Sequence, residues 1–140
     1  MEKAKKRRKK IEQLEKSVPS LLAAFQIGIH VSSFGFDWSG PLDSLQKVKE
    51  EISELERALE AREEKEISQE IGDIFFALAN VSRLLGVNPE KALKKTNEKF
   101  MKRFAFVEKK LKEQGKELGQ ASLEEMDKIW EESKKLKIKK

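Results

Sequence analysis

The stretch EISELERALEAREEKEISQEIGDIFFALANVSRLL, residues 51–85, decides the fold, because apolar residues recur through it and just before it at helical spacing. Two sets follow this spacing: Leu45, Val48, Ile52, Leu55 and Leu59, and then Ile71, Ile74, Phe75, Leu78, Val81 and Leu85. We expect two amphipathic helices with these residues buried, one beginning near Leu42 and one over 67–85. A bend within the highly charged residues 60–66 should separate them.

Four acidic residues stand at the margins of these two apolar seams: Glu51 and Glu54, then Glu70 and Asp73. A spacing of three residues places both members of each pair on one face of a helix. Carboxylates beside a buried seam are costly unless they are paired or bound to a metal. The sequence therefore predicts a site for a hard cation, with Mg²⁺ the best candidate. The alternative is that residues 50–66 form only a solvated charged face.

Helix signals continue on both sides of this stretch. Before it, we expect a helix from Pro19 and Ser20 to about Ile29 and His30, and then an aromatic loop over 33–41 with Ser39 or Asp43 as the cap of the next helix. After it, Gly86, Asn88 and Pro89 end one helix and start a fourth, which runs through Leu93, Phe100, Phe104, Val107 and Leu111 and ends by Gly115. A Ser122–Glu125 capping box then begins a last helix with Met126, Ile129 and Trp130. The single histidine, His30, is expected to pack at a helix end. No segment resembles a strand, so the sequence predicts an all-α fold of four to five helices.

Composition limits the class of protein. A chain of 140 residues suits one domain, and the absence of cysteine excludes disulfides and thiolate metal sites. No apolar run approaches the roughly 20 residues that span a bilayer, so we expect a cytoplasmic protein without a membrane partner. Residues 1–17 are basic and predict a solvated tail or linker remnant, with the folded domain over 18–140. No aromatic residue interrupts that basic run, so a nucleic-acid partner is not expected.

Basic and aromatic side chains could complement the acids. Lys99 and Arg103 are four residues apart beside an apolar seam, where they could reach phosphate oxygens. Trp130 and Lys134, also four apart, could supply a stacking plane and a further phosphate contact. The alternatives are ordinary surface positions for the two basic residues Lys99 and Arg103 and core packing for Trp130.

The chain resembles, over residues 19–134, the catalytic domain of the MazG family of nucleoside triphosphate pyrophosphohydrolases. The matching segments are PSLLAAF (19–25), GFDW (35–38), KVKEEISEL (47–55), EIGDIFFALANVSRLLGVNPEKAL (70–93), TNEKFMKRF (96–104) and LEEMDKIWEESK (123–134). The similarity is to the C-terminal half of two-domain members. It implies a MazG-like bundle of four to five helices that works as a homodimer or a higher oligomer.

The resemblance also implies an activity and a set of site residues. Glu51, Glu54, Glu70 and Asp73 match the family's catalytic metal-binding ExxE…ExxD motif, which takes Mg²⁺ with Mn²⁺ able to substitute. Lys47, Lys99, Arg103, Trp130 and Lys134 match nucleotide-binding positions. The implied reaction is Mg²⁺-dependent hydrolysis of a nucleoside triphosphate to the monophosphate and pyrophosphate. The alternative is a non-catalytic helical dimer that binds nucleotide or another protein.

Overall fold

A computed structural model describes residues 1–135 of the chain, and these residues are helical with no strand among them. The elements are α1 (Glu2–Ser17), α2 (Ser20–Ser32), α3 (Pro41–Ala61), α4 (Glu64–Leu84), α5 (Pro89–Glu113), a short 3₁₀ helix η1 (Leu118–Gln120) and α6 (Leu123–Ser133). The all-α prediction is confirmed. The described residues contain six α-helices, one more than expected, because the basic segment at the N-terminus forms a regular helix. No helix among them is long and apolar enough to cross a membrane.

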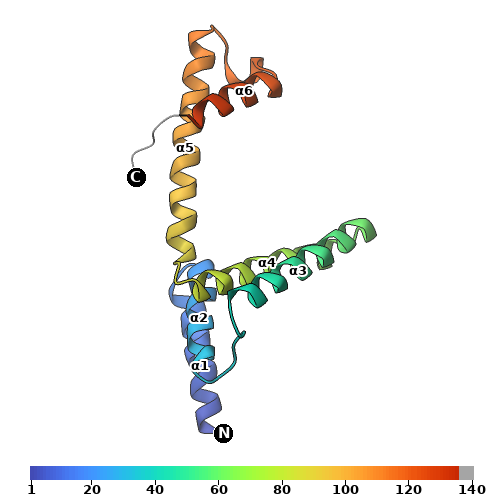
Figure 1. The fold of residues 1–140 in the computed structure, drawn as a ribbon, viewed down its shortest axis with the longest axis vertical. Helices are drawn as coiled ribbons and strands as arrows, with labels where there is room; N and C mark the ends of the chain where they lie inside the picture. Colours follow the sequence, from blue (N-terminus) through green and yellow to red (C-terminus); the bar gives the residue numbers. More distant parts are fainter. Residues whose placement is uncertain (136–140) are drawn as a thin grey trace. The chain divides into compact units, whose positions relative to one another are not determined.

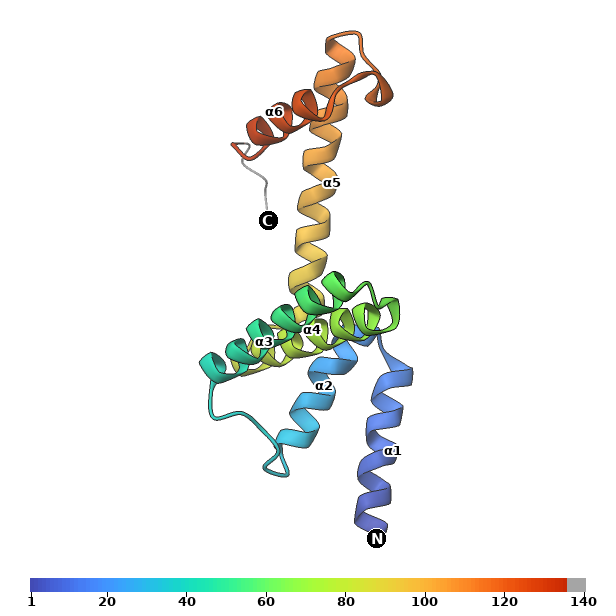
Figure 2. The same ribbon diagram turned by 90° about the vertical axis from the view of Figure 1, so that its right-hand side faces the viewer.

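The chain divides into two compact units, one from Met1 to Ala92 and the other from Leu93 onward. In the first unit α3 and α4 form a helical hairpin and run side by side (Figures 1 and 2), while α2 packs against α4 and α1 packs against α2. The buried residues of this unit are mostly small: Ala23, Val48, Ala58, Ala77 and Ala79. Small side chains allow helix backbones to approach closely, so polar groups on neighbouring helices can meet.

The connection between α3 and α4 lies in the segment where a bend was predicted. Arg62 ends α3 in the left-handed conformation, with φ 56°, and the backbone N–H of Glu63 donates to the carbonyl of Ala58. Glycine is the residue that usually takes this conformation. Because a charged residue takes it here, the sequence carried no signal for the exact position of the turn.

The start of α3 differs from the prediction that Ser39 or Asp43 caps it. Gly40 occupies the N-cap position and makes no side-chain cap, and Pro41 begins the helix. The Ser39 hydroxyl donates instead to the Asp43 carboxylate. The start of α5 agrees with the prediction, because Asn88 Oδ1 accepts from the backbone N–H groups of Glu90 and Lys91 at 3.0 and 3.1 Å. Gly86, with φ 72°, follows α4 as expected.

Many apolar residues that were expected to be buried are exposed in this chain, which corrects the prediction for both seams. Val48 is buried, but these seam residues are not: Leu45, Ile52 and Leu59 on α3, and Ile71, Phe75, Leu78 and Leu85 at the positions predicted for α4. Phe76, also on α4, is exposed as well. The fully buried positions of α4 are instead Ala77, Ala79 and Asn80, which are small or polar. The apolar residues do follow a helical spacing, but this spacing does not show whether another part of the chain buries the apolar face.

The second unit has its own core. Val107 and Leu111 of α5 pack with Ile129 of α6, and partly buried residues surround them: Phe106, Leu118, Ala121, Met126 and Trp130. Leu93, Phe100 and Phe104 of α5 are exposed, contrary to the expected seam. Ser122 caps α6 by accepting from the N–H of Glu125 at 3.1 Å, as predicted. The Glu125 carboxylate pairs with Lys116 at 2.6 Å.

Candidate metal centre

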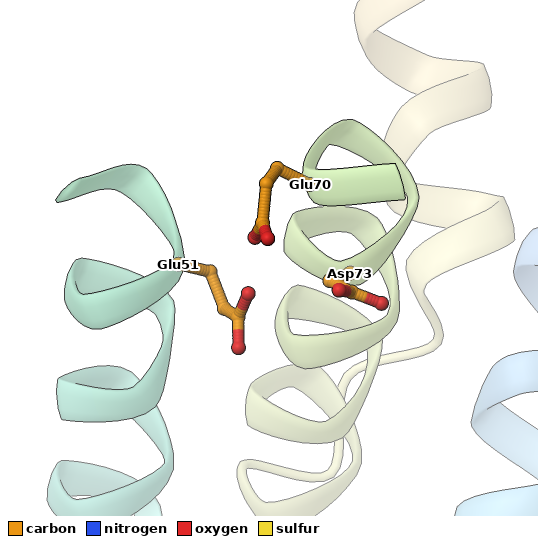
Figure 3. A group of neighbouring side chains, drawn as sticks. All are labelled: Glu51, Glu70 and Asp73. Carbon is orange, nitrogen blue, oxygen red and sulfur yellow. The ribbon is translucent and has the colours of Figure 1, made fainter. Parts of the chain in front are cut away.

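Three of the four predicted acids come together between α3 and α4. One carboxylate oxygen from each of Glu51, Glu70 and Asp73 lies within 4.8 Å of the other two. Glu51 points from α3 toward Glu70 on α4, and Asp73 lies one turn further along α4 (Figure 3). Glu51 is buried, Glu70 is partly buried and Asp73 is exposed, so the group reaches from the helix interface to the surface.

Glu54 lies beside this group rather than within it. It lines a surface hollow of about 500 Å³ together with Glu70, and Arg57, Ala58, Ala61, Glu66 and Gln69 complete the lining. Its charge is one of the causes that raise the pKa of Glu70. The fourth acid therefore acts on Glu70 and Glu51 from the next turn of α3. Arg57 is a lining residue that the sequence reasoning missed, although its position three residues after Glu54 places it on the same helix face.

Glu51 and Glu70 shift each other's pKa values. A hydrogen bond with Glu51 is the largest cause that raises the pKa of Glu70 to about 7, followed by burial and the charges of Glu54 and Glu51. The pKa of Glu51 is held below its usual value, first by its hydrogen bond from Lys47 and then by its contact with Glu70. Two carboxylates at such a distance cannot both ionise cheaply without a proton or a cation between them.

Lys47 is the basic partner of this site. Its Nζ donates to Glu51 Oε1 at 3.0 Å, one helical turn away on α3, and the pKa of Lys47 is raised by this bond. The more distant Glu50, at 4.0 Å, makes a weaker pair. Lys47 therefore lies at the edge of the acidic group, where it could pair with a phosphate in place of the Glu51 carboxylate.

The donor set suits a hard divalent cation. Oε2 of Glu51 and Oε2 of Glu70 are buried without a donor from the rest of the described chain. Buried polar atoms in this position need a partner, and carboxylate oxygens are the ligands that Mg²⁺ and Mn²⁺ prefer. A cation between these oxygens would supply that partner and offset the repulsion. The residues present therefore fit a divalent metal ion.

The remaining predicted residues belong to the second unit. Arg103 lies over the ring of Trp130, 5.9 Å from its centroid, and Arg103 Nε is buried without a hydrogen-bond partner in the described residues. Lys134 Nζ donates to Glu131 at 3.0 Å, and Lys99 is exposed. Phe100, which the sequence reasoning treated only as an apolar seam residue, contacts Trp130 with its ring centroid 5.2 Å away. Within this unit Arg103, Trp130 and Phe100 thus form one surface.

Comparisons with known proteins identify similar sequences. Residues 40–107 match the model of the MazG nucleotide pyrophosphohydrolase domain, a range that contains α3, α4 and all four acids. The chain is 38% identical over 133 residues to the nucleoside triphosphate pyrophosphohydrolase/pyrophosphatase MazG of Thermotoga maritima, covering 95% of this chain and 51% of that protein. It is 37% identical over 134 residues to the nucleoside triphosphate pyrophosphohydrolase of Escherichia coli K12, covering 91% of this chain and 49% of the relative.

A further relative is the protein YabN of Bacillus subtilis, 51% identical over 75 residues, which are 54% of this chain and 15% of YabN. The chain spans about half the length of the two pyrophosphohydrolases that it matches. The similarity to these two proteins covers nearly the whole chain, and the matched domain model includes the acidic group between α3 and α4. Residues 40–107 of the chain are therefore identified as a MazG nucleotide pyrophosphohydrolase domain.

Proposed function

We propose that this protein hydrolyses nucleoside triphosphates to nucleoside monophosphates and pyrophosphate in a reaction that depends on Mg²⁺. The observation that carries the proposal is the convergence of Glu51, Glu70 and Asp73 within the matched domain. In the reaction a water oxygen bonds to the α-phosphorus, the bond from that phosphorus to the bridging oxygen breaks, and pyrophosphate leaves. The proton released by the water passes to solvent. Because the proposed substrates belong to the nucleotide pool, we also propose that the protein acts in the cytoplasm.

Glu51, Glu54, Glu70 and Asp73 would hold the metal. Bound Mg²⁺ supplies positive charge to the phosphate oxygens and lowers the pKa of a coordinated water, and Mn²⁺ can replace it in such oxygen sites. Glu51 is kept ionised by Lys47, so it is available as a ligand at neutral pH. The contact with Glu51 raises the pKa of Glu70 to about 7, so a cation that binds Glu70 would compete with a proton for this carboxylate near neutral pH.

The cationic residues would hold the triphosphate. We assign phosphate contacts to Lys47, Lys99, Arg103 and Lys134, because an arginine fork and lysine point charges match phosphate oxygens. Trp130 would contact the nucleotide through its ring, against which Arg103 and Phe100 already pack. These residues bind the substrate and offset charge as the anhydride bond breaks. We place the catalytic domain over residues 18–140, preceded by the basic segment 1–17.

We further propose that the protein is a homodimer, with the α3–α4 hairpin in the interface. Large apolar residues are exposed on both helices of the hairpin, including Phe75 at 57% and Leu59 at 54%. Soluble monomers rarely expose large contiguous apolar patches. Phe75→Glu should therefore shift the mass measured by light scattering from dimer to monomer. Leu123→Glu, at a position on α6 that is also exposed, is the matched control and should leave the mass unchanged.

The activity is tested with purified protein, Mg²⁺ and a panel of canonical, deoxy and damaged nucleoside triphosphates, with pyrophosphate and phosphate measured separately. Pyrophosphate release should be lost in Glu51→Gln, which keeps the shape of the side chain but removes its charge. Glu56→Gln removes a charge from an exposed position of the same helix and should keep wild-type activity. Nucleotide binding without pyrophosphate across the whole panel would instead support the alternative of a non-catalytic binding dimer.

A further inference from the structure

A polar network joins the loop before α3 to α4 in the first unit, and α2 packs against it. Arg83, near the end of α4, donates through Nη2 to Asp37 Oδ1 at 2.5 Å and through Nη1 to Asp37 Oδ2 at 3.2 Å. Its Nε donates to Asn80 Oδ1 at 3.2 Å, and Asn80 Nδ2 donates to the carbonyl of Phe76 at 3.3 Å. The Arg83 side chain is only 9% exposed, and Asn80 is 2% exposed. Gly28 of α2 lies directly against both side chains.

The partner of Arg83 lies just before α3. Asp37 is four residues before Pro41, the first residue of α3, and also accepts from the Trp38 N–H at 2.8 Å. The next hydroxyl, Ser39, bonds to Asp43 in the first turn of α3. A short chain of bonds thus connects the start of α3 to the end of α4.

The hairpin is therefore held at both ends. At one end the chain itself connects α3 to α4 through Arg62 and Glu63, and at the other the Asp37–Arg83 pair makes the connection. The metal ligands lie between these ends: Glu51 is ten residues after Pro41, and Arg83 is ten residues after Asp73. Ten residues of helix correspond to about 15 Å. A slip or opening of the two helices at the Arg83 end would change the separation of Glu51 from Glu70 and Asp73.

We propose that the Asp37–Arg83 pair is a clamp that sets the register of α3 against α4, and so positions the acids of the metal site. Asp37 and Arg83 are positioning residues, since they act through the helices and not by contact with the metal. The inference rests on the proposed metal site. It differs from a purely structural role because it predicts weaker metal binding in a protein that remains folded.

The test measures Mn²⁺ affinity by the electron paramagnetic resonance signal of the free ion, with circular dichroism as a check on folding. Asp37→Asn and Arg83→Met should each weaken Mn²⁺ binding roughly fivefold, as expected for coupling from residues outside a site. The double variant should bind no more weakly than either single variant, because both substitutions remove the same pair. At saturating Mg²⁺ and substrate, kcat of Asp37→Asn should approach the wild-type value.

Lys116→Met is the control, because Lys116 and Glu125 form an ion pair between two segments of the second unit, at 2.6 Å. It should lower thermal stability without changing Mn²⁺ affinity. Wild-type affinity in both clamp variants, or an equal loss in Lys116→Met, would overturn the clamp while leaving the proposed function standing. Absence of Mn²⁺ binding by the wild-type protein would instead show that the proposed metal site is wrong.

Discussion

The closest contact of α2 with the clamp predicts that Gly28→Ala destabilises the protein. A methyl group at Gly28 would lie 2.5 Å from Asn80 Oδ1, 2.7 Å from Arg83 Nε and 3.0 Å from Arg83 Cδ. Overpacking of this kind costs about 1–3 kcal/mol, and a displaced buried hydrogen bond costs a further ~1–3 kcal/mol. Alanine gains about 1 kcal/mol over glycine in a helix. The sum is a net loss of about 3 kcal/mol.

The assay is thermal unfolding followed by circular dichroism at one fixed protein concentration, so that association does not confuse the comparison. A loss of about 3 kcal/mol should lower the midpoint by roughly 6–12 °C in a chain of this size. Gly72→Ala is the matched control, because Gly72 also lies within a helix but has no atom within 4 Å of the added methyl group. It should raise the midpoint slightly. A Gly28→Ala protein as stable as the wild type would refute the close packing of α2 on the Asn80–Arg83 pair.

Two pH effects follow from the shifted carboxyls. The hydrogen bonds from Arg83 hold the pKa of Asp37 below 3.8, so the stability from this pair is complete above pH 3.8 and is lost as pH falls through the lower folded pKa. Asp37→Asn should therefore lose less stability than the wild type on acidification, which unfolding midpoints from pH 5 down to pH 2 can check. Glu70 has the opposite sign, because its pKa is raised from 4.5 to about 7: without metal, stability should fall as pH rises between these values. Unfolding in a chelator should show this fall in the wild type and not in Glu70→Gln.

Local signals in the sequence predicted local structure well. Gly86, Asn88 and Pro89 fixed the boundary between α4 and α5, because each acts through its own backbone or its nearest N–H groups. Ser122 capped α6 for the same reason. The three-residue spacing of Glu70 and Asp73 predicted that both lie on one face of α4, and both approach Glu51 of α3. In these cases the cause lies within one helical turn of the residue that reveals it.

Longer-range features could not be predicted in the same way. Asp37 and Arg83 are 46 residues apart, and neither has a neighbour in sequence that marks it as half of a pair. Phe75 is exposed although its position in the helical period predicted burial, because the period shows that a helix face is apolar but not what covers that face. Arg62 takes a left-handed conformation without the glycine that would have marked it. These positions depend on how helices meet, which single-helix patterns do not record.

The acids of the hairpin should couple metal binding to the stability of the fold. Glu51 of α3 meets Glu70 of α4 in the hairpin, and the contact is unfavourable when both are ionised. A cation that binds only the folded site should therefore stabilise the protein, by about 2.7 kcal/mol at 100 times its Kd. Unfolding midpoints should rise with Mg²⁺ in the wild type and much less in Glu51→Gln, with Glu56→Gln responding as the wild type does. An equal rise in all three proteins would mean that Mg²⁺ stabilises the chain at some other place. The assignment of the metal centre to the acidic group would then be wrong.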